Sequence, residues 1–385
     1  MIEDFRRNIT HRFASFFSVD WILMCAVFLV AAAGMVTMNS FVGSNFQFEK
    51  QLLWVFIMTF FSIGISFIDF RFLRRTGVLV ALFASSCVVL LVLLGFVTAT
   101  KGAESWFKLG GVSFQPSDPI KVILILVLAK YFSRRHIEIA NIRHILVSGV
   151  YAFIIFGLVF LQPDFGSAII MFCIWLGMVL VSGINKKHLF AVFLIGALVF
   201  GGLWVGVFKD YQKNRIMNFI HPLADIRGTG YNAYQSTVAV GSGQILGKGV
   251  GYGTQSRLKF LPEYETDFIF AAFAEEWGYV GVMLLFVLYG VIIWRVLANA
   301  VRGATNFEIL FGCGVAILFI SHFLVHIGMN IGLLPVTGVT VPFMSYGGSH
   351  LLTEFGAIGL LMGMRRYSRP AHKDSARNEI VGVGA

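Results

Sequence analysis

The chain has 385 residues, of which 57% are apolar and only 13% are Asp, Glu, Lys or Arg. A soluble domain carries about 25% charged residues, so this chain has too few charges to cover a water-facing surface of its size. Together with 41 Gly and 40 Phe, this composition excludes a soluble enzyme, a disordered chain and a coiled coil. The four cysteines all lie in apolar runs and are interpreted as free, buried thiols.

Ten apolar segments predict membrane-spanning helices, each of which needs roughly 20 residues to cross the hydrocarbon core. The predicted limits are 20–38, 51–68, 76–98, 117–132, 145–163, 165–184, 188–207, 266–294, 307–331 and 349–364. The predicted fold class is an all-α polytopic membrane protein of about ten transmembrane helices. It would consist of a cytoplasmic segment 1–19, a membrane domain 20–366 and a disordered cytoplasmic tail 367–385. Residues 208–265 would form one large extracytoplasmic loop between the seventh and eighth helices.

Basic residues predict the orientation. With the N-terminus inside, most of the 30 Lys and Arg residues lie in short, dense cytoplasmic clusters, as the positive-inside rule requires. Both termini are therefore expected in the cytoplasm. The net charge of +10 then indicates attraction to anionic membrane lipids and not to nucleic acid. The first apolar run is too long for a cleavable signal peptide.

Asp267 is the last polar residue before the eighth predicted helix. Its position at the outer edge of an apolar region suits a general base. The alternative, which spacing alone favours, is that Thr266 or Asp267 caps the helix. Glu275 and Glu276 lie deeper on the same helix. They are expected either to be functional, as ionisable residues inside membranes often are, or to pair with a buried Lys or Arg.

A second candidate site begins at the fourth predicted helix. Ser117 is predicted to cap this helix. Asp118 and Lys121 are three residues apart and therefore share a helical face. They either form a structural pair or present Lys121 as a cation to a lipid-linked phosphate, and spacing does not decide between the two. Trp106, just upstream, is typical of an interfacial aromatic belt.

The long loop is rich in glycine between residues 228 and 253, and cations are interleaved with the glycines. Such glycines let the backbone approach a polar ligand closely, although a flexible linker is the alternative. In the ninth helix, His322 and His326 have the spacing of a metal pair, but no third ligand follows. Hydrogen bonding between helices is therefore preferred. Residues 334–349 predict a re-entrant hairpin next to the site.

Several segments, in this order, resemble the SEDS family (shape, elongation, division and sporulation). They are Phe114-Gln115-Pro116-Ser117, Gln162-Pro163-Asp164, Gln235-Ser236, Gly247-Lys248-Gly249, Leu261-Pro262-Glu263, Thr266-Asp267-Phe268-Ile269-Phe270 and Pro342-Phe343-Met344-Ser345-Tyr346-Gly347-Gly348-Ser349. The stretch around Gly253-Thr254-Gln255-Ser256 is more similar to the RodA-like elongation branch than to the FtsW-like division branch. Asp118 replaces the usual Glu, and His326 stands where Asn is commoner.

The resemblance implies an inverting peptidoglycan glycosyltransferase that polymerises lipid II into β-1,4 glycan strands at the outer face of the cytoplasmic membrane. It implies Asp267 as the catalytic base and a class B penicillin-binding protein as partner, besides the lipid-linked strand and membrane lipids. The expected substrate-binding residues are Lys121, Asp118, Gln115, Trp106, Arg215, Lys259 and Ser345.

Lys121, Arg215 and Lys259 would neutralise the pyrophosphate leaving group, for which a divalent cation, Mg²⁺ or Mn²⁺, is an alternative. No other cofactor and no metal ligand is predicted. Two further hypotheses are a flippase or transporter of a lipid-linked precursor, suggested by Glu275 and Glu276, and a structural scaffold. The long outer loop and a carboxylate at the membrane rim favour the enzyme.

Overall fold

The computed structural model describes residues 19–40, 46–96, 107–109, 112–134, 142–206, 208, 210–221, 230–258 and 260–367. Trp106, Lys259, residues 1–18 and the tail beyond residue 367 lie outside this part of the chain. The helices are α2 (Trp21–Asn39), α3 (Phe46–Ile65), the 3-10 helix η1 (Phe70–Arg74), α4 (Thr76–Phe96), α5 (Ser117–Ser133), α6 (Ile142–Leu161), α7 (Phe165–Val181), α8 (Lys186–Gly206), α9 (Asp210–Ile220), α10 (Tyr231–Ser242), α11 (Thr254–Arg257), α12 (Ile269–Val301), α13 (Asn306–Asn330) and α14 (Gly348–Arg366).

Each of the ten predicted segments contains a helix. Among the described residues, seven helices are long and apolar enough to cross a membrane: α2, α3, α4, α6, α8, α12 and α13. Of the other three, α5 and α7 have 17 residues each, and α14 carries several ionisable side chains. The chain is thus a helical, multi-pass membrane protein.

A small β-hairpin, which the all-α prediction missed, precedes α5. Strands β1 (Phe107–Leu109) and β2 (Val112–Phe114) pair in antiparallel fashion, with Phe107 opposite Phe114. Each strand has only three residues, too few for the alternating pattern that predicts strands from sequence.

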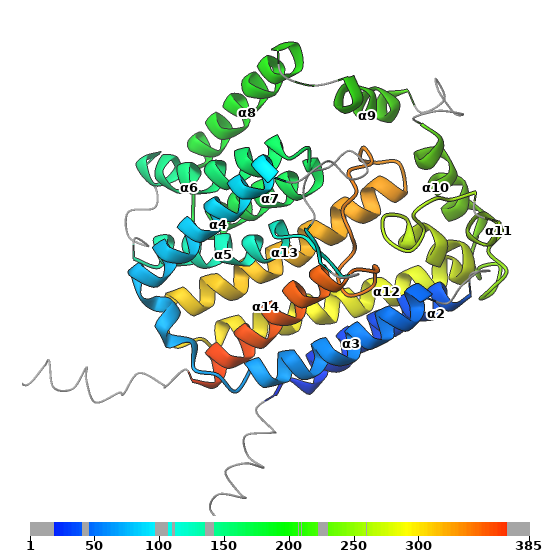
Figure 1. Ribbon diagram of the computed structural model, residues 1–385, viewed down its shortest axis with the longest axis horizontal. Coiled ribbons are helices and arrows are strands. Elements are labelled where there is room, and N and C mark those ends of the chain that lie inside the picture. Colours follow the sequence, from blue (N-terminus) through cyan, green and yellow to red (C-terminus); the bar gives the residue numbers. More distant parts are fainter. Residues whose placement is uncertain are drawn as a thin grey trace, which may run out of the picture.

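The bundle is built around α12 and α13, as Figure 1 shows. Helix α12 packs against α2, α10 and α13, while α13 packs against α5 and α7, and α14 packs against α3. By contrast, α8 has no buried residue and lies at the edge of the bundle (Figure 1). The loop helices α10 and α11 lie at the end of the bundle where α12 begins (Figure 1).

Helix α12 differs from its prediction in extent and shape. It runs to Val301 instead of residue 294, and it is broken at Gly278, whose φ of 62° and ψ of −168° are not helical. A positive φ is accessible to glycine at little cost.

The end of the bundle opposite Asp267 is held together by charged groups. Asp20 precedes α2, is 3% exposed, and accepts hydrogen bonds from Arg295 Nε at 3.0 Å and Nη2 at 2.7 Å. Asn299 Nδ2 donates to the same carboxylate at 2.7 Å, and Arg365 donates to Asn299 Oδ1. This network joins the start of α2 to the ends of α12 and α14.

We predict that Asp20→Ala destabilises the protein by about 3 kcal/mol, because it leaves the Arg295 guanidinium largely buried without its carboxylate. Thermal unfolding in detergent measures this as a lowered melting temperature. Asp69→Ala, which removes a solvent-accessible carboxylate that pairs with Arg71 and caps η1, is the control and should lower the melting temperature much less. Equal effects of the two substitutions would contradict the role of Asp20.

Candidate functional site

Asp267 lies in a turn, residues 261–268, that leads into α12. The turn is fixed through the backbone on both sides of Asp267. Asn330 Nδ2 donates to the carbonyl oxygen of Asp267 at 3.0 Å, and Ser345 Oγ donates to the carbonyl oxygen of Thr266 at 2.9 Å. Both Asn330 and Ser345 are buried. The ends of α13 and of the loop before α14 therefore set the position of Asp267.

The capping prediction for this helix is wrong. The N-cap position of α12 is occupied by Phe268, which makes no side-chain capping bond. The amide of Ala271, one of the orphan donors at the helix start, donates instead to Asn330 Oδ1 at 3.2 Å. Asn330, from α13, thus satisfies this amide, which is the capping role that was expected of Thr266 or Asp267.

The loop between α13 and α14, residues 331–347, packs against the Asp267 carboxylate. A Cβ atom built on Gly338 would lie 3.5 Å from Asp267 Oδ2, and Gly338 has a φ of 72°. The amide of Tyr346 donates to the carbonyl oxygen of Glu265 at 2.9 Å. The predicted hairpin therefore exists as a loop, with extended and turn conformations, that forms one wall beside the carboxylate.

The phenol groups of two tyrosines lie in the same region as Asp267. Burial, reinforced by the nearby charge of Glu265, raises the pKa of both Tyr264 and Tyr346. Both phenols therefore stay protonated at neutral pH, when they can donate hydrogen bonds to an oxygen-rich ligand.

Lys121 lies in a buried cluster of charged side chains. Its Nζ is 2.9 Å from Asp118 Oδ1, and both residues are less than 5% exposed. His350 on α14 is 3.8 Å from the same Asp118 oxygen and 2.7 Å from Glu354 Oε1. Glu354 Oε2 accepts from the Phe343 amide at 2.8 Å, so the cluster is tied to the loop that also contacts Asp267.

Gln115 and Ser117 face α7 and α14. Gln115 Nε2 donates to Asp164 Oδ2 at 2.7 Å, and the Gln115 backbone exchanges hydrogen bonds with Ser349 Oγ. Ser117 also donates to Asp164, and Pro116 occupies the N-cap of α5 without a side-chain bond. The prediction of Ser117 as the cap of that helix is wrong.

Of the remaining predicted site residues, Ser345 lies next to Asp267. Its hydroxyl bonds to Thr266 and Val341, which makes it part of the support of the turn. Arg215 belongs to α9, while Trp106 and Lys259 lie outside the described residues. The sequence feature that could have pointed to Asn330 is its place on the same helical face as His322 and His326. His350 and Glu354 were missed, because their i, i+4 spacing in an apolar helix has no partner until the fold is known.

The other ionisable residues noted in the sequence have structural partners. Glu275 pairs with Lys248, which is partly exposed and lies in the loop before α12, whereas the structural alternative expected a buried Lys or Arg. His322 and His326 bond through Nδ1 to the carbonyl oxygens of Thr340 and Val339, so these hydrogen bonds hold the loop and are not made between helices. Within the described residues, no group of three or more His, Cys, Asp or Glu could hold a metal ion.

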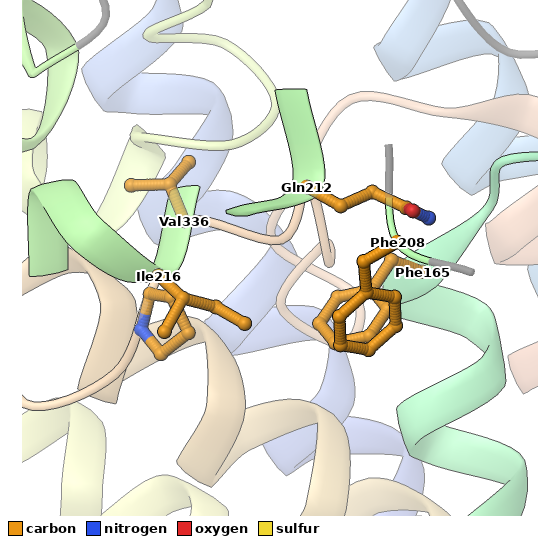
Figure 2. A pocket seen from close by; sticks show the side chains of 6 residues that line it. Phe165, Phe208, Gln212, Ile216 and Val336 are labelled. Atoms are coloured by element: carbon orange, nitrogen blue, oxygen red, sulfur yellow. The ribbon is translucent and has the colours of Figure 1, made fainter. Parts of the chain in front are cut away.

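A small, mostly apolar pocket lies between the start of α7, helix α9 and the loop before α14 (Figure 2). It is lined by Phe165, Phe208, Gln212, Ile216, Pro335 and Val336. In Figure 2 the ring of Phe208 lies next to that of Phe165, and Gln212 extends over them from α9. The start of α7 and helix α9 are thereby joined to the loop that carries Gly338.

Comparisons with known proteins agree on one family. The FtsW/RodA/SpoVE model, described as a cell cycle protein, matches residues 12–370. Peptidoglycan glycosyltransferase MrdB of Escherichia coli K12 is 37% identical over 288 residues, which are 74% of this chain and 78% of that protein.

Two solved structures are also similar. A chain from "Structural coordination of polymerization and crosslinking by a peptidoglycan synthase complex" has a TM-score of 0.78 and 29% identity, covering 91% of this chain and 99% of that one. The rod shape determining protein RodA of Thermus thermophilus has a TM-score of 0.68 and 26% identity, covering 91% and 97%.

We predict that Asn330→Ala lowers the free energy of unfolding by about 1–3 kcal/mol, because it strips partners from buried backbone groups of residues 267 and 271. Hydrogen exchange followed by mass spectrometry should show faster exchange at the start of α12. If peptides covering residues 265–272 exchanged as in the parent protein, Asn330 would not be what holds this turn.

Proposed function

The chain belongs to the FtsW/RodA/SpoVE family of cell cycle proteins, and from this premise we propose that it is a peptidoglycan glycosyltransferase that polymerises lipid II for cell elongation. The elongation role agrees with the resemblance to MrdB and RodA. The observation that carries the assignment of the site is the fixed turn around Asp267. Asn330 and Ser345 bind the backbone on either side of this residue, and Gly338 lies against its carboxylate.

The proposed topology has ten membrane-spanning helices with both termini in the cytoplasm. The cell wall then lies on the opposite, outer side of the cytoplasmic membrane. Arg74 ends η1, and Arg295 and Arg365 lie toward the C-terminal ends of α12 and α14, whereas Asp267 precedes the start of α12. Cytoplasmic ends of membrane helices are enriched in such residues. Asp267 and the loop 208–265 then face the extracytoplasmic side, where the glycan strand grows.

The reaction joins the 4-hydroxyl of an acceptor sugar to the anomeric carbon of a donor that is linked to lipid pyrophosphate. Asp267 accepts the hydroxyl proton as the oxygen attacks, because a neutral alcohol is a weak nucleophile. The bond from the anomeric carbon to the phosphate oxygen breaks, and its electron pair leaves with the pyrophosphate. This direct displacement inverts the anomeric centre and gives a β-linked strand.

Lys121 is the cation proposed for the leaving group. In the structure it is bound to Asp118, so an incoming pyrophosphate has to compete for it. His350, 3.8 Å from the same carboxylate, can balance the charge of Asp118 when Lys121 turns to the phosphate. Gln115 would support the part of the site around Lys121 through its bond to Asp164. Further candidates for binding the substrate are Trp106, Arg215 and Lys259.

A class B penicillin-binding protein is the proposed partner, since the similar chain comes from a peptidoglycan synthase complex that coordinates polymerisation and crosslinking. The transport hypothesis loses its main support, because Glu275 and Glu276 are both bound by the loop that precedes α12. Carboxylates of a transport path are expected to face a water-filled cavity or other helices.

We predict that Asp267→Asn lowers glycan polymerisation at least 10²-fold, because the amide cannot accept the proton. Purified protein is incubated with lipid II in detergent, and the strands are sized on a gel. The melting temperature should change far less than the polymerisation rate, since the amide keeps the size and shape of the carboxylate. Long strands produced by Asp267→Asn at the parental rate would refute Asp267 as the base.

We predict that Lys121→Ala lowers both the melting temperature and the rate at which lipid II is used as the donor. The double variant Asp118→Asn/Lys121→Ala should recover the melting temperature but not this rate. The single variant leaves a buried carboxylate for which His350 is the remaining cationic partner among the described residues, and the double variant removes that charge. Melting temperatures and initial rates against lipid II concentration separate the two effects. Parental polymerisation by the double variant would give Lys121 a structural role alone.

A further inference from the structure

The break in α12 at Gly278 is repaired by another part of the chain. In an unbroken helix the carbonyl oxygens of Glu275 and Glu276 would pair with the amides of Tyr279 and Val280. Here the Glu275 oxygen accepts from the Lys248 amide, and the Glu276 oxygen accepts from the Gly249 amide, both at 3.0 Å.

The amides on the other side of the break are satisfied by the same segment. Tyr279 donates to the Gln244 oxygen at 2.9 Å, and Val280 donates to the Ile245 oxygen at 3.1 Å. Residues 244–249, which we call the splice segment, thus supply partners for all four groups. At membrane depth such partners are required, because water is not available to replace them.

Glycines permit the close approach of the two backbones. A Cβ atom on Gly243 would lie 2.0 Å from the Ala274 oxygen, and one on Gly247 would lie 2.1 Å from the Glu276 oxygen. No side chain fits at those distances. These glycines therefore allow the loop to contact α12, whereas the sequence suggested that they allow the loop to contact a ligand.

Side chains lock the splice segment in place. Glu275, which is 0% exposed, accepts from Lys248 Nζ at 2.7 Å, from Thr254 Oγ1 at 3.0 Å and from the Gln255 amide at 3.2 Å. Glu276 accepts from the Gly251 amide at 3.0 Å and from Ser40 Oγ at the end of α2. Both carboxylates thus accept hydrogen bonds from the loop between α10 and α12.

The part of α12 from residue 269 to 277 is therefore held at both ends. Its N-terminal end is bound by Asn330, whose carbonyl oxygen accepts from Ser236 Oγ on α10 at 2.8 Å. Its C-terminal end is bound by the splice segment, which follows α10 directly in the chain. The Leu261 amide also donates to the Gln255 oxygen at 3.0 Å, which links the loop to the turn of Asp267.

We propose that Glu275 and Lys248 are positioning residues for Asp267. Through the splice segment they fix the direction of the short helix that begins two residues after Asp267, and hence the place of its carboxylate relative to the acceptor hydroxyl. This inference rests on the proposed function. It assigns to the GKG motif and to the buried glutamate a role in the geometry of proton transfer, and not in transport or ligand binding.

The test compares Lys248→Met and Lys248→Arg with the parent in lipid II polymerisation. Lys248→Met should lower kcat about 100-fold with KM nearly unchanged, since a displacement of about 1 Å can cost this much. Lys248→Arg keeps the charge opposite Glu275 and should retain most of the activity. Glu275→Gln should resemble Lys248→Met.

Glu308→Gln is the matched control. Glu308 is 4% exposed and pairs with Arg74, which is 30% exposed, while the corresponding values for Glu275 and Lys248 are 0% and 29%. The control removes a carboxylate of similar burial at the other end of the bundle. It should change the melting temperature as Glu275→Gln does, but leave kcat at the parental value.

Hydrogen exchange of residues 263–268 gives a readout that does not depend on activity. Lys248→Met should accelerate exchange there and leave α13 unchanged. Unchanged exchange, unchanged kcat in Lys248→Met, or an equal fall of kcat in Glu308→Gln would each overturn the positioning role. If the parent protein made no glycan from lipid II, the proposed function would fail, and the exchange experiment alone would decide whether Lys248 positions the turn.

Discussion

The need to satisfy backbone hydrogen bonds around the first part of α12 is the constraint on which the structure of this site depends. A turn, a helix start and a helix break follow one another between residues 261 and 280, at the rim of a membrane bundle where unpaired groups are costly. Asn330, Ser345 and the splice segment supply the partners. Because these partners come from α13, from the loop before α14 and from the loop before α12, Asp267 is placed by three separate parts of the chain.

The same loop, residues 331–347, connects the two halves of the proposed active site. At Gly338 and Ser345 it contacts the Asp267 region, and at Phe343 it bonds to Glu354, whose neighbour His350 approaches Asp118. The proposed base and the proposed cation for the leaving group are thus attached to one structural unit. Holding the two groups in a fixed relation is what a displacement reaction between two bound sugars requires.

Much of the fold was predictable, because long apolar runs and basic clusters report directly on membrane helices. A helix lies in every predicted segment, and motifs such as Thr266-Asp267-Phe268 pointed to the family. The local details were not predictable. Sequence could not show that Asn330 and not Asp267 satisfies the start of α12, that Gly278 breaks the helix, or that His350 joins Asp118, because each depends on residues that only tertiary packing brings together.

The most direct measurement of the central claim is a structure of the Asp267→Asn protein bound to lipid II in the acceptor position. The account predicts that the acceptor 4-hydroxyl lies within about 3 Å of the side chain at position 267, as proton transfer requires. A complex in which that hydroxyl faces a different side chain, with residue 267 turned away from the sugar, would contradict it.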